Sequence, residues 1–127
     1  MSSIDMYEEV NAHSEVMTAS SHRLIQLLFD KCLEQLNYAE GKQLSDERAY
    51  AIALGRAIEI VAYLRACLRY EDEQTANLAH HLETLYAYSH RALVQISLKP
   101  NEQLLNEVKT VLRNIKEGWD GIADKVQ

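Results

Sequence analysis

The sequence predicts an all-α protein, an antiparallel up-down four-helix bundle with a short N-terminal helical or cap segment. The 127 residues include one proline and four glycines, which is too few for the turns of an all-β protein. Four long segments repeat apolar residues at spacings of three and four, which is the helical period. The connectors between them are short and polar, so consecutive helices should be antiparallel neighbours.

The first helix is expected to begin near Ser20, a competent N-cap residue, and to end at Gly41. Glycine suits the left-handed backbone conformation that commonly ends a helix. Leu24 and Leu27 lie off the main apolar stripe of this helix. That stripe predicts the following core residues: Ile25, Leu28, Cys32, Leu36 and Ala39.

The second helix is expected from an N-cap at Ser45 or Asp46 to about Tyr70. Its predicted core face comprises Ala53, Ala57, Ile60, Leu64 and Leu68. A second stripe, about 140° around a helix that turns about 100° per residue, consists mostly of small residues: Ala51, Gly55, Ile58, Ala62 and Ala66. Glycine inside a helix costs about 1 kcal/mol relative to alanine, so Gly55 indicates a packing role. The stripe contacts either a second neighbouring helix of the bundle or a partner helix in a groove.

The third and fourth helices follow on either side of Pro100, which cannot continue a helix. The third runs from about Thr75 to Leu98, with the expected core residues Leu78, Leu82, Leu85, Ser89, Leu93 and Ile96. Asn101 is the predicted N-cap of the fourth, and Glu102 stands in its favourable first turn. The stripe of the fourth helix comprises Leu104, Val108, Val111, Ile115, Trp119, Ile122 and Val126.

The whole chain, residues 1–127, is expected to form a single helical-bundle domain. Within it, residues 1–19 would be an N-terminal cap segment and residues 20–127 the bundle. In the cap segment Ile4, Tyr7 and Val10 recur at every third position, with acidic residues between them. So short a stretch is marginal as a helix by itself.

Net charge and hydropathy limit the classes of partner, and the cysteines indicate the cellular compartment. The net charge of −6 disfavours nucleic acid and anionic membranes, which attract basic surfaces. No stretch of about 18 apolar residues predicts membrane insertion, and the N-terminus does not resemble a signal peptide. Cys32 and Cys67 each lie in an apolar helical stretch and predict buried, reduced thiols. Together these features predict a cytoplasmic protein.

The sequence contains no recognisable pattern of catalytic or metal-binding residues. The paired Glu-x-x-His motifs of di-iron bundles are absent, and so are phosphate-binding loops and nucleophile elbows. His80, His81 and Glu83 form a local cluster that is more simply a solvated helix face than a metal site. We therefore expect no enzyme activity, no metal and no cofactor, with a metal-containing or enzymatic bundle kept as an alternative.

Several segments together point to a family. The stretch Thr18-Ala-Ser-Ser-His-Arg-Leu-Ile-Gln-Leu-Leu-Phe-Asp30 resembles one in which the flagellar export chaperone family, the FliS proteins, typically has Ser-Pro-His, Leu-Ile and a Leu-Tyr/Phe-Asp triplet. Ser21 stands where that family usually has proline, which affects the start of the helix rather than function. Glu59 replaces a frequent glutamine, and Arg69-Tyr70-Glu71 replaces the usual turn. Further similar segments are Tyr7 with Val10; Ile58, Ile60 and Leu64; Asn77-Leu78 with Leu82, Leu85-Tyr86 and Tyr88; and Leu104-Leu105 to Trp119.

The resemblance implies a cytoplasmic chaperone that binds the disordered C-terminal region of flagellin. Such a protein prevents premature polymerisation and assists delivery to the flagellar type III export gate. We expect Tyr7 and Val10 to form a displaceable cap over the client groove. The groove itself is expected at Ala51, Gly55, Ile58 and Ala62, with Leu24 and Leu27 as neighbours. The alternative is an oligomeric regulatory or interaction protein whose second stripe is a self-interface, and whether the chain is a monomer or a homodimer stays open.

Overall fold

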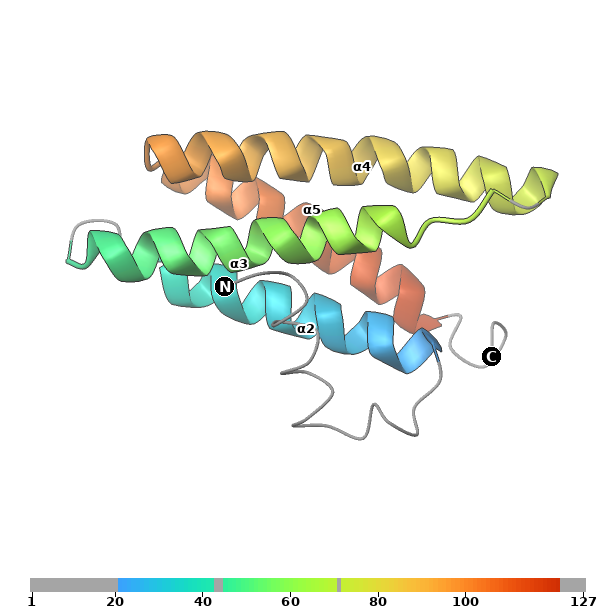
Figure 1. Ribbon diagram of the computed structural model, residues 1–127, viewed down its shortest axis with the longest axis horizontal. Coiled ribbons are helices and arrows are strands. Elements are labelled where there is room, and N and C mark those ends of the chain that lie inside the picture. Colours follow the sequence, from blue (N-terminus) through green and yellow to red (C-terminus); the bar gives the residue numbers. More distant parts are fainter. Residues whose placement is uncertain (1–20, 43–44, 71, 122–127) are drawn as a thin grey trace.

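The computed structural model describes residues 21–42, 45–70 and 72–121. These residues form four helices, which run alternately in opposite directions (Figure 1) and confirm the predicted all-α antiparallel bundle. The predicted cap residues Tyr7 and Val10, the predicted N-cap Ser20, and Ile122 and Val126 lie outside the described residues. The helices are α2 (Ser21–Ala39), α3 (Glu47–Ala66), α4 (Glu73–Leu98) and α5 (Glu102–Gly121).

Three of the helices lie side by side and the fourth crosses behind them. In Figure 1, α3 lies between α2 and α4, and α5 passes behind α3 from α4 towards α2. α5 therefore packs against α4 and α2, and the core lies between α3 and α5. One side of α3, the side turned away from α5, is left without a neighbouring described helix.

Helix starts and ends follow the local signals in the sequence. The carboxylate of Asp46 accepts a hydrogen bond from the Ala49 amide at 3.0 Å, and the Asn101 side chain accepts one from the Leu104 amide at 3.0 Å. Gly41 has a φ of 86°, the left-handed conformation expected of a residue after a helix. The predicted end of the second helix near Tyr70 is wrong. That helix ends at Ala66, with Cys67 as its C-cap, because the chain must turn before Asp72 caps the next helix.

The predicted core stripes of the first two helices are confirmed over most of their length. The buried residues include Leu28, Cys32, Leu36 and Ala39 of α2 and Ala53, Ala57, Ile60 and Leu64 of α3. They pack with side chains that the stripes did not include, such as Phe29, Leu54, Val61, Tyr86, Leu105 and Leu112.

Two core predictions are wrong, both for reasons of helix length. Leu78 is 50% exposed. It belongs to the first turns of α4, and these turns extend past the end of α3, so α3 does not cover them (Figure 1). Cys67 is exposed because it follows the last residue of α3, whereas Cys32 is fully buried; both thiols are free. Trp119, also predicted as core, is only half-buried.

Candidate functional site: the outer face of α3

The outer side of α3 carries mostly small and apolar residues between Ala51 and Ala66, with half-buried Glu59 as the charged residue among them. The exposed small and apolar residues, which we call the α3 face, are Ala51, Ile52, Gly55, Ala62 and Ala66. Ile58, predicted as part of the same stripe, is half-buried and packs against the core. The predicted small-residue stripe therefore lies on the surface for most of its length, rather than against a second helix of the described bundle.

Gly55 has no structural need to be glycine. A Cβ atom built on it would meet no described atom within 4 Å, and its backbone is helical, outside the left-handed region. Glycine at this position lowers helix stability by about 1 kcal/mol relative to alanine. The packing role predicted for Gly55 is thus not found within the described bundle, and close approach of another chain would supply one.

On one flank the α3 face continues onto α4. Arg65 of α3 donates to Glu83 of α4 at 2.7 Å, and the Tyr50 hydroxyl donates to the carbonyl oxygen of Ile96 at 2.9 Å. Since the two helices are antiparallel, these contacts place Gly55 about level with Ala92 and Ala51 about level with Ile96, so Val94 and Leu98 lie within a turn of them. Val94 and Leu98 lie on the side of α4 that carries Glu83, hence next to α3. They are 37% and 83% exposed.

The other flank is formed by α2. The Cys32 thiol lies 3.8 Å from the carbonyl oxygen of Ala57, which places Leu27 level with Ala62 and Tyr38 level with Ala51. Leu24 and Leu27 are half-buried and pack against the core. The predicted groove residues therefore do not line one groove. Leu24 and Leu27 lie on the α2 side of α3, whereas Ile58 shares the α4 side with Arg65.

Sequence reasoning missed the large apolar residues around the α3 face. Tyr38, Ile52, Val94 and Leu98 are all exposed, and all lie near the end of the bundle where α3 begins and α4 ends. Their exposure depends on how neighbouring helices are aligned along the bundle axis, and the apolar periodicity of a single helix does not predict that alignment. The position of Leu98 just before Pro100, at the end of its helix, was the one available local signal.

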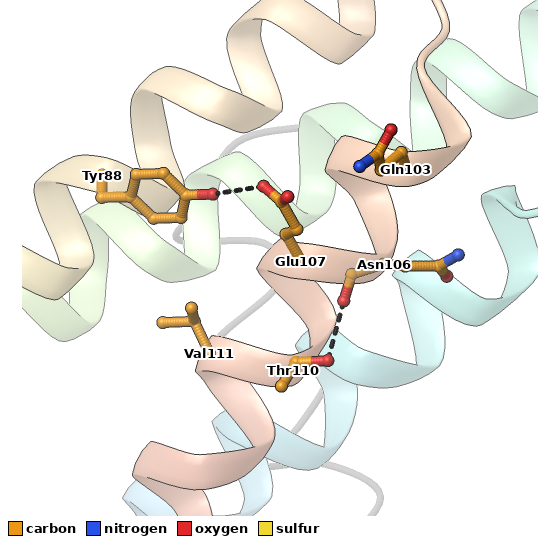
Figure 2. Close-up of a pocket in the computed structure, with 6 residues that line it drawn as sticks. All are labelled: Tyr88, Gln103, Asn106, Glu107, Thr110 and Val111. Carbon is orange, nitrogen blue, oxygen red and sulfur yellow. Dashed lines mark hydrogen bonds between the residues drawn. The ribbon is translucent and has the colours of Figure 1, made fainter.

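A shallow hollow of about 560 Å³ lies on a different side of the bundle, between α4 and α5 (Figure 2). The Tyr88 hydroxyl donates to Glu107 at 3.1 Å, and burial together with this bond raises the pKa of Tyr88. The Thr110 hydroxyl donates to the Asn106 carbonyl oxygen at 2.9 Å. These groups are engaged with one another and offer no activated nucleophile.

The described residues contain no group of three histidine, cysteine, aspartate or glutamate side chains placed to hold a metal ion. In the predicted local cluster, Glu83 is paired with Arg65, and His80 stacks edge-on against Tyr70 at 5.0 Å between ring centroids. None of the described helices combines the length and apolarity needed to cross a lipid bilayer. The α3 face differs from an ordinary solvated helix surface, because its exposed residues from Ala51 to Ala66 are mostly small or apolar.

The fold and this face together define a helical-bundle protein with an apolar outer surface suited to another apolar segment. The model of the flagellar protein FliS family matches residues 3–126, and the chain belongs to that family.

Curated relatives match over nearly the whole chain. The flagellar secretion chaperone FliSB of Pseudomonas aeruginosa is 36% identical over 124 residues, covering 97% of each chain. The flagellar secretion chaperone FliS of Salmonella typhimurium is 37% identical, over 98% of this chain and 92% of its own. That of Vibrio cholerae is 31% identical, over 94% and 88%. Membership of this family supports an export chaperone role and confirms the resemblance noted in the sequence.

Proposed function

We propose that this protein is a flagellar export chaperone that binds the C-terminal region of flagellin. In this role it keeps flagellin from polymerising prematurely and assists its delivery to the flagellar type III export apparatus. Support comes from the family and from the names of the relatives, which are secretion chaperones. The observation that carries the proposal is the α3 face with its small and apolar residues, on a helix whose neighbours leave one side open.

The size of the α3 face suits a helical client segment. From Ala51 to Ala66 it spans about 22 Å at 1.5 Å per residue, which is four turns of helix. Small residues along its centre allow a second helix to approach closely, and the larger exposed side chains stand at its edges. An amphipathic segment that is disordered in the free client could lay its apolar side here and fold as it binds.

The edges would contribute much of the binding energy. Leu98 is 83% exposed, so covering it would recover most of the roughly 2 kcal/mol that burial of a leucine side chain provides. Val94, Ile52 and Tyr38 would add smaller amounts, because each is already partly covered. Association and ordering of the client oppose these gains, so only the surplus would appear as affinity.

We further propose that residues 1–127 act as one domain and that residues 1–19 cap the site when it is empty. Tyr7 and Val10 would then cover apolar side chains that the client later covers. The competing proposal places a second copy of this chain on the α3 face, which would make the protein a regulatory homodimer. Light scattering separates the two, since a stable dimer that does not bind flagellin would favour the second.

The decisive experiment is calorimetric titration with a peptide from the C-terminus of flagellin of the same organism. We expect submicromolar one-to-one binding with a negative heat-capacity change, the signature of apolar burial. A peptide of the same composition in scrambled order is the control. Absence of heat at several temperatures, with a peptide that does bind the Salmonella relative, would contradict the proposal.

A further inference from the structure

The corner where α2 begins and α5 ends is held by a reciprocal contact between His22 and Trp119. The imidazole Nε2 of His22 lies 2.8 Å from the Trp119 carbonyl oxygen, to which it donates a hydrogen bond. The indole N–H of Trp119 donates to the His22 carbonyl oxygen at 3.0 Å. The two rings stack with centroids 4.7 Å apart and planes 9° from parallel. We call this pair the corner latch.

Polar side chains surround the latch. Gln26 donates to Asp120 at 2.6 Å, and Lys116 donates to the other oxygen of Asp120 at 2.7 Å while lying 3.4 Å from Asp30. The hydrogen bond from Lys116 lowers the pKa of Asp120. All of these groups except His22 are partly exposed, and exposed ion pairs add little to stability.

Apolar burial secures this end of α5 less than it secures the first half, although Ile115 packs against the core. The fully buried residues of the helix are Leu105, Val108, Lys109 and Leu112. Among residues 113–121 no side chain is fully buried, and Ile115 and Trp119 are half-buried. The end of α5 therefore depends on the latch more than the first half of the helix does.

The latch also contains an unmet hydrogen-bonding group. Since Nε2 of His22 faces a carbonyl oxygen, Nε2 carries a proton and donates it, which leaves Nδ1 as the second hydrogen-bonding atom of the ring. Nδ1 is buried and has no hydrogen-bond partner within the described part of the chain. Buried polar groups are normally paired, so water entering an opened corner would satisfy an atom that the closed corner leaves unmet.

We infer that residues 113–121 of α5 form a separately opening unit, held closed on α2 by the corner latch. Opening breaks both latch hydrogen bonds and uncovers Ile115 and Trp119, while α3, α4 and the first half of α5 stay packed. The latch joins the second residue of α2 to a residue two positions before the end of α5, and so connects the two ends of the described bundle. It is independent of the client proposed above, and its test uses the full chain alone.

Native-state hydrogen exchange of the wild-type protein tests the opening directly. Amides of residues 116–121 are expected to exchange at least a hundredfold faster than buried amides of α3, and with a weak dependence on low concentrations of denaturant. This combination reports local opening rather than global unfolding. Equal rates and equal denaturant dependence for the two sets would overturn the inference.

The role of the latch is tested with His22→Phe, which keeps a flat ring against Trp119 but removes the Nε2 donor. Exchange at residues 116–121 should rise about tenfold, the effect of losing one hydrogen bond of ordinary strength. The matched control is His81→Phe, at an exposed position on α4, which should leave these amides unchanged.

Trp119→Phe is the second variant, since it removes the indole donor from the other side of the latch. It should raise exchange at residues 116–121 in the same way, and it remains informative if His22→Phe does not fold. If neither variant changes the exchange of these amides, the latch does not hold this end of α5 and the inference is overturned.

Discussion

Substitution of Gly55 by arginine separates binding from stability more cleanly than any change at a buried position. Ile58, the largest residue of the predicted stripe, packs against the core, so altering it would disturb the fold as well. Gly55 is exposed, and an added Cβ meets no described atom within 4 Å. The backbone at this exposed position therefore accepts a Cβ atom without displacing a described atom, and a longer side chain can extend from it.

The expected magnitudes have opposite signs for folding and for binding. Replacing a mid-helix glycine with arginine should raise the free energy of unfolding by roughly 0.5–1 kcal/mol, because arginine is a good helix former. For a chain of this length that corresponds to about 2–4 °C in melting temperature. A guanidinium on the α3 face would hold the client helix away, and we expect its affinity to fall at least about a hundredfold, or about 2.7 kcal/mol.

Urea unfolding measures the change in the free energy of unfolding, and calorimetric titration with the flagellin peptide measures the change in affinity. Gly55→Ala should be stabilised similarly and bind within a few-fold of wild type. Thr110→Arg, at an exposed position on α5, should bind normally and controls for the added charge. Wild-type affinity in a folded Gly55→Arg would refute the assignment of the site to α3, and a destabilised Gly55→Ala would refute our account of the glycine.

Three further outcomes follow from particular contacts. Glu40→Gln should lower the free energy of unfolding, measured in urea, by about 1–2 kcal/mol, because buried Lys109 donates to both Glu40 oxygens at 3.1–3.3 Å. Adding Lys109→Met to this variant should restore part of the lost stability, because it removes the buried charge left without its partner. Burial raises the pKa of Cys32 to about 12, so a thiol reagent should modify exposed Cys67 in the native protein and Cys32 only on unfolding. Rapid modification of both cysteines in the native protein would contradict the packing of α2 on α3. Leu98→Asp should change stability by less than about 0.5 kcal/mol yet weaken client binding about tenfold, whereas unchanged binding would remove Leu98 from the site.

The features that could be predicted from the sequence are the ones fixed by local interactions. Asp46 and Asn101 cap helices because their side chains reach amides three residues ahead, and Gly41 ends a helix because it can adopt a positive φ. The core stripes of α2 and α3 follow from the helical period alone. The small-residue stripe on α3 was also visible, because Gly55 breaks the local preference for good helix formers.

The remaining features depend on how far each helix extends past its neighbour. Leu78 continues the apolar stripe of α4 perfectly well, but α3 ends before it can cover that position. Leu24 and Leu27 lie off the stripe of α2, and only the pairing with α3 shows that they belong to a different flank from Ile58. The latch between His22 and Trp119 joins residues 97 positions apart, beyond the reach of any periodicity.

A comparison of two helices within the molecule bears on where the partner binds. The outward side of α5 is that of an ordinary solvated helix, with exposed residues such as Glu102, Gln103, Asn106, Arg113 and Glu117. The outward side of α3 is equally open, but between Ala51 and Ala66 it consists mainly of alanine, glycine and isoleucine, with half-buried Glu59 among them. Both helices contribute to one core, so the demands of folding do not account for the difference. Contact with a second chain would explain why the middle of α3 presents small and apolar residues where α5 presents polar ones, and for that reason we propose α3 as the place where the client binds.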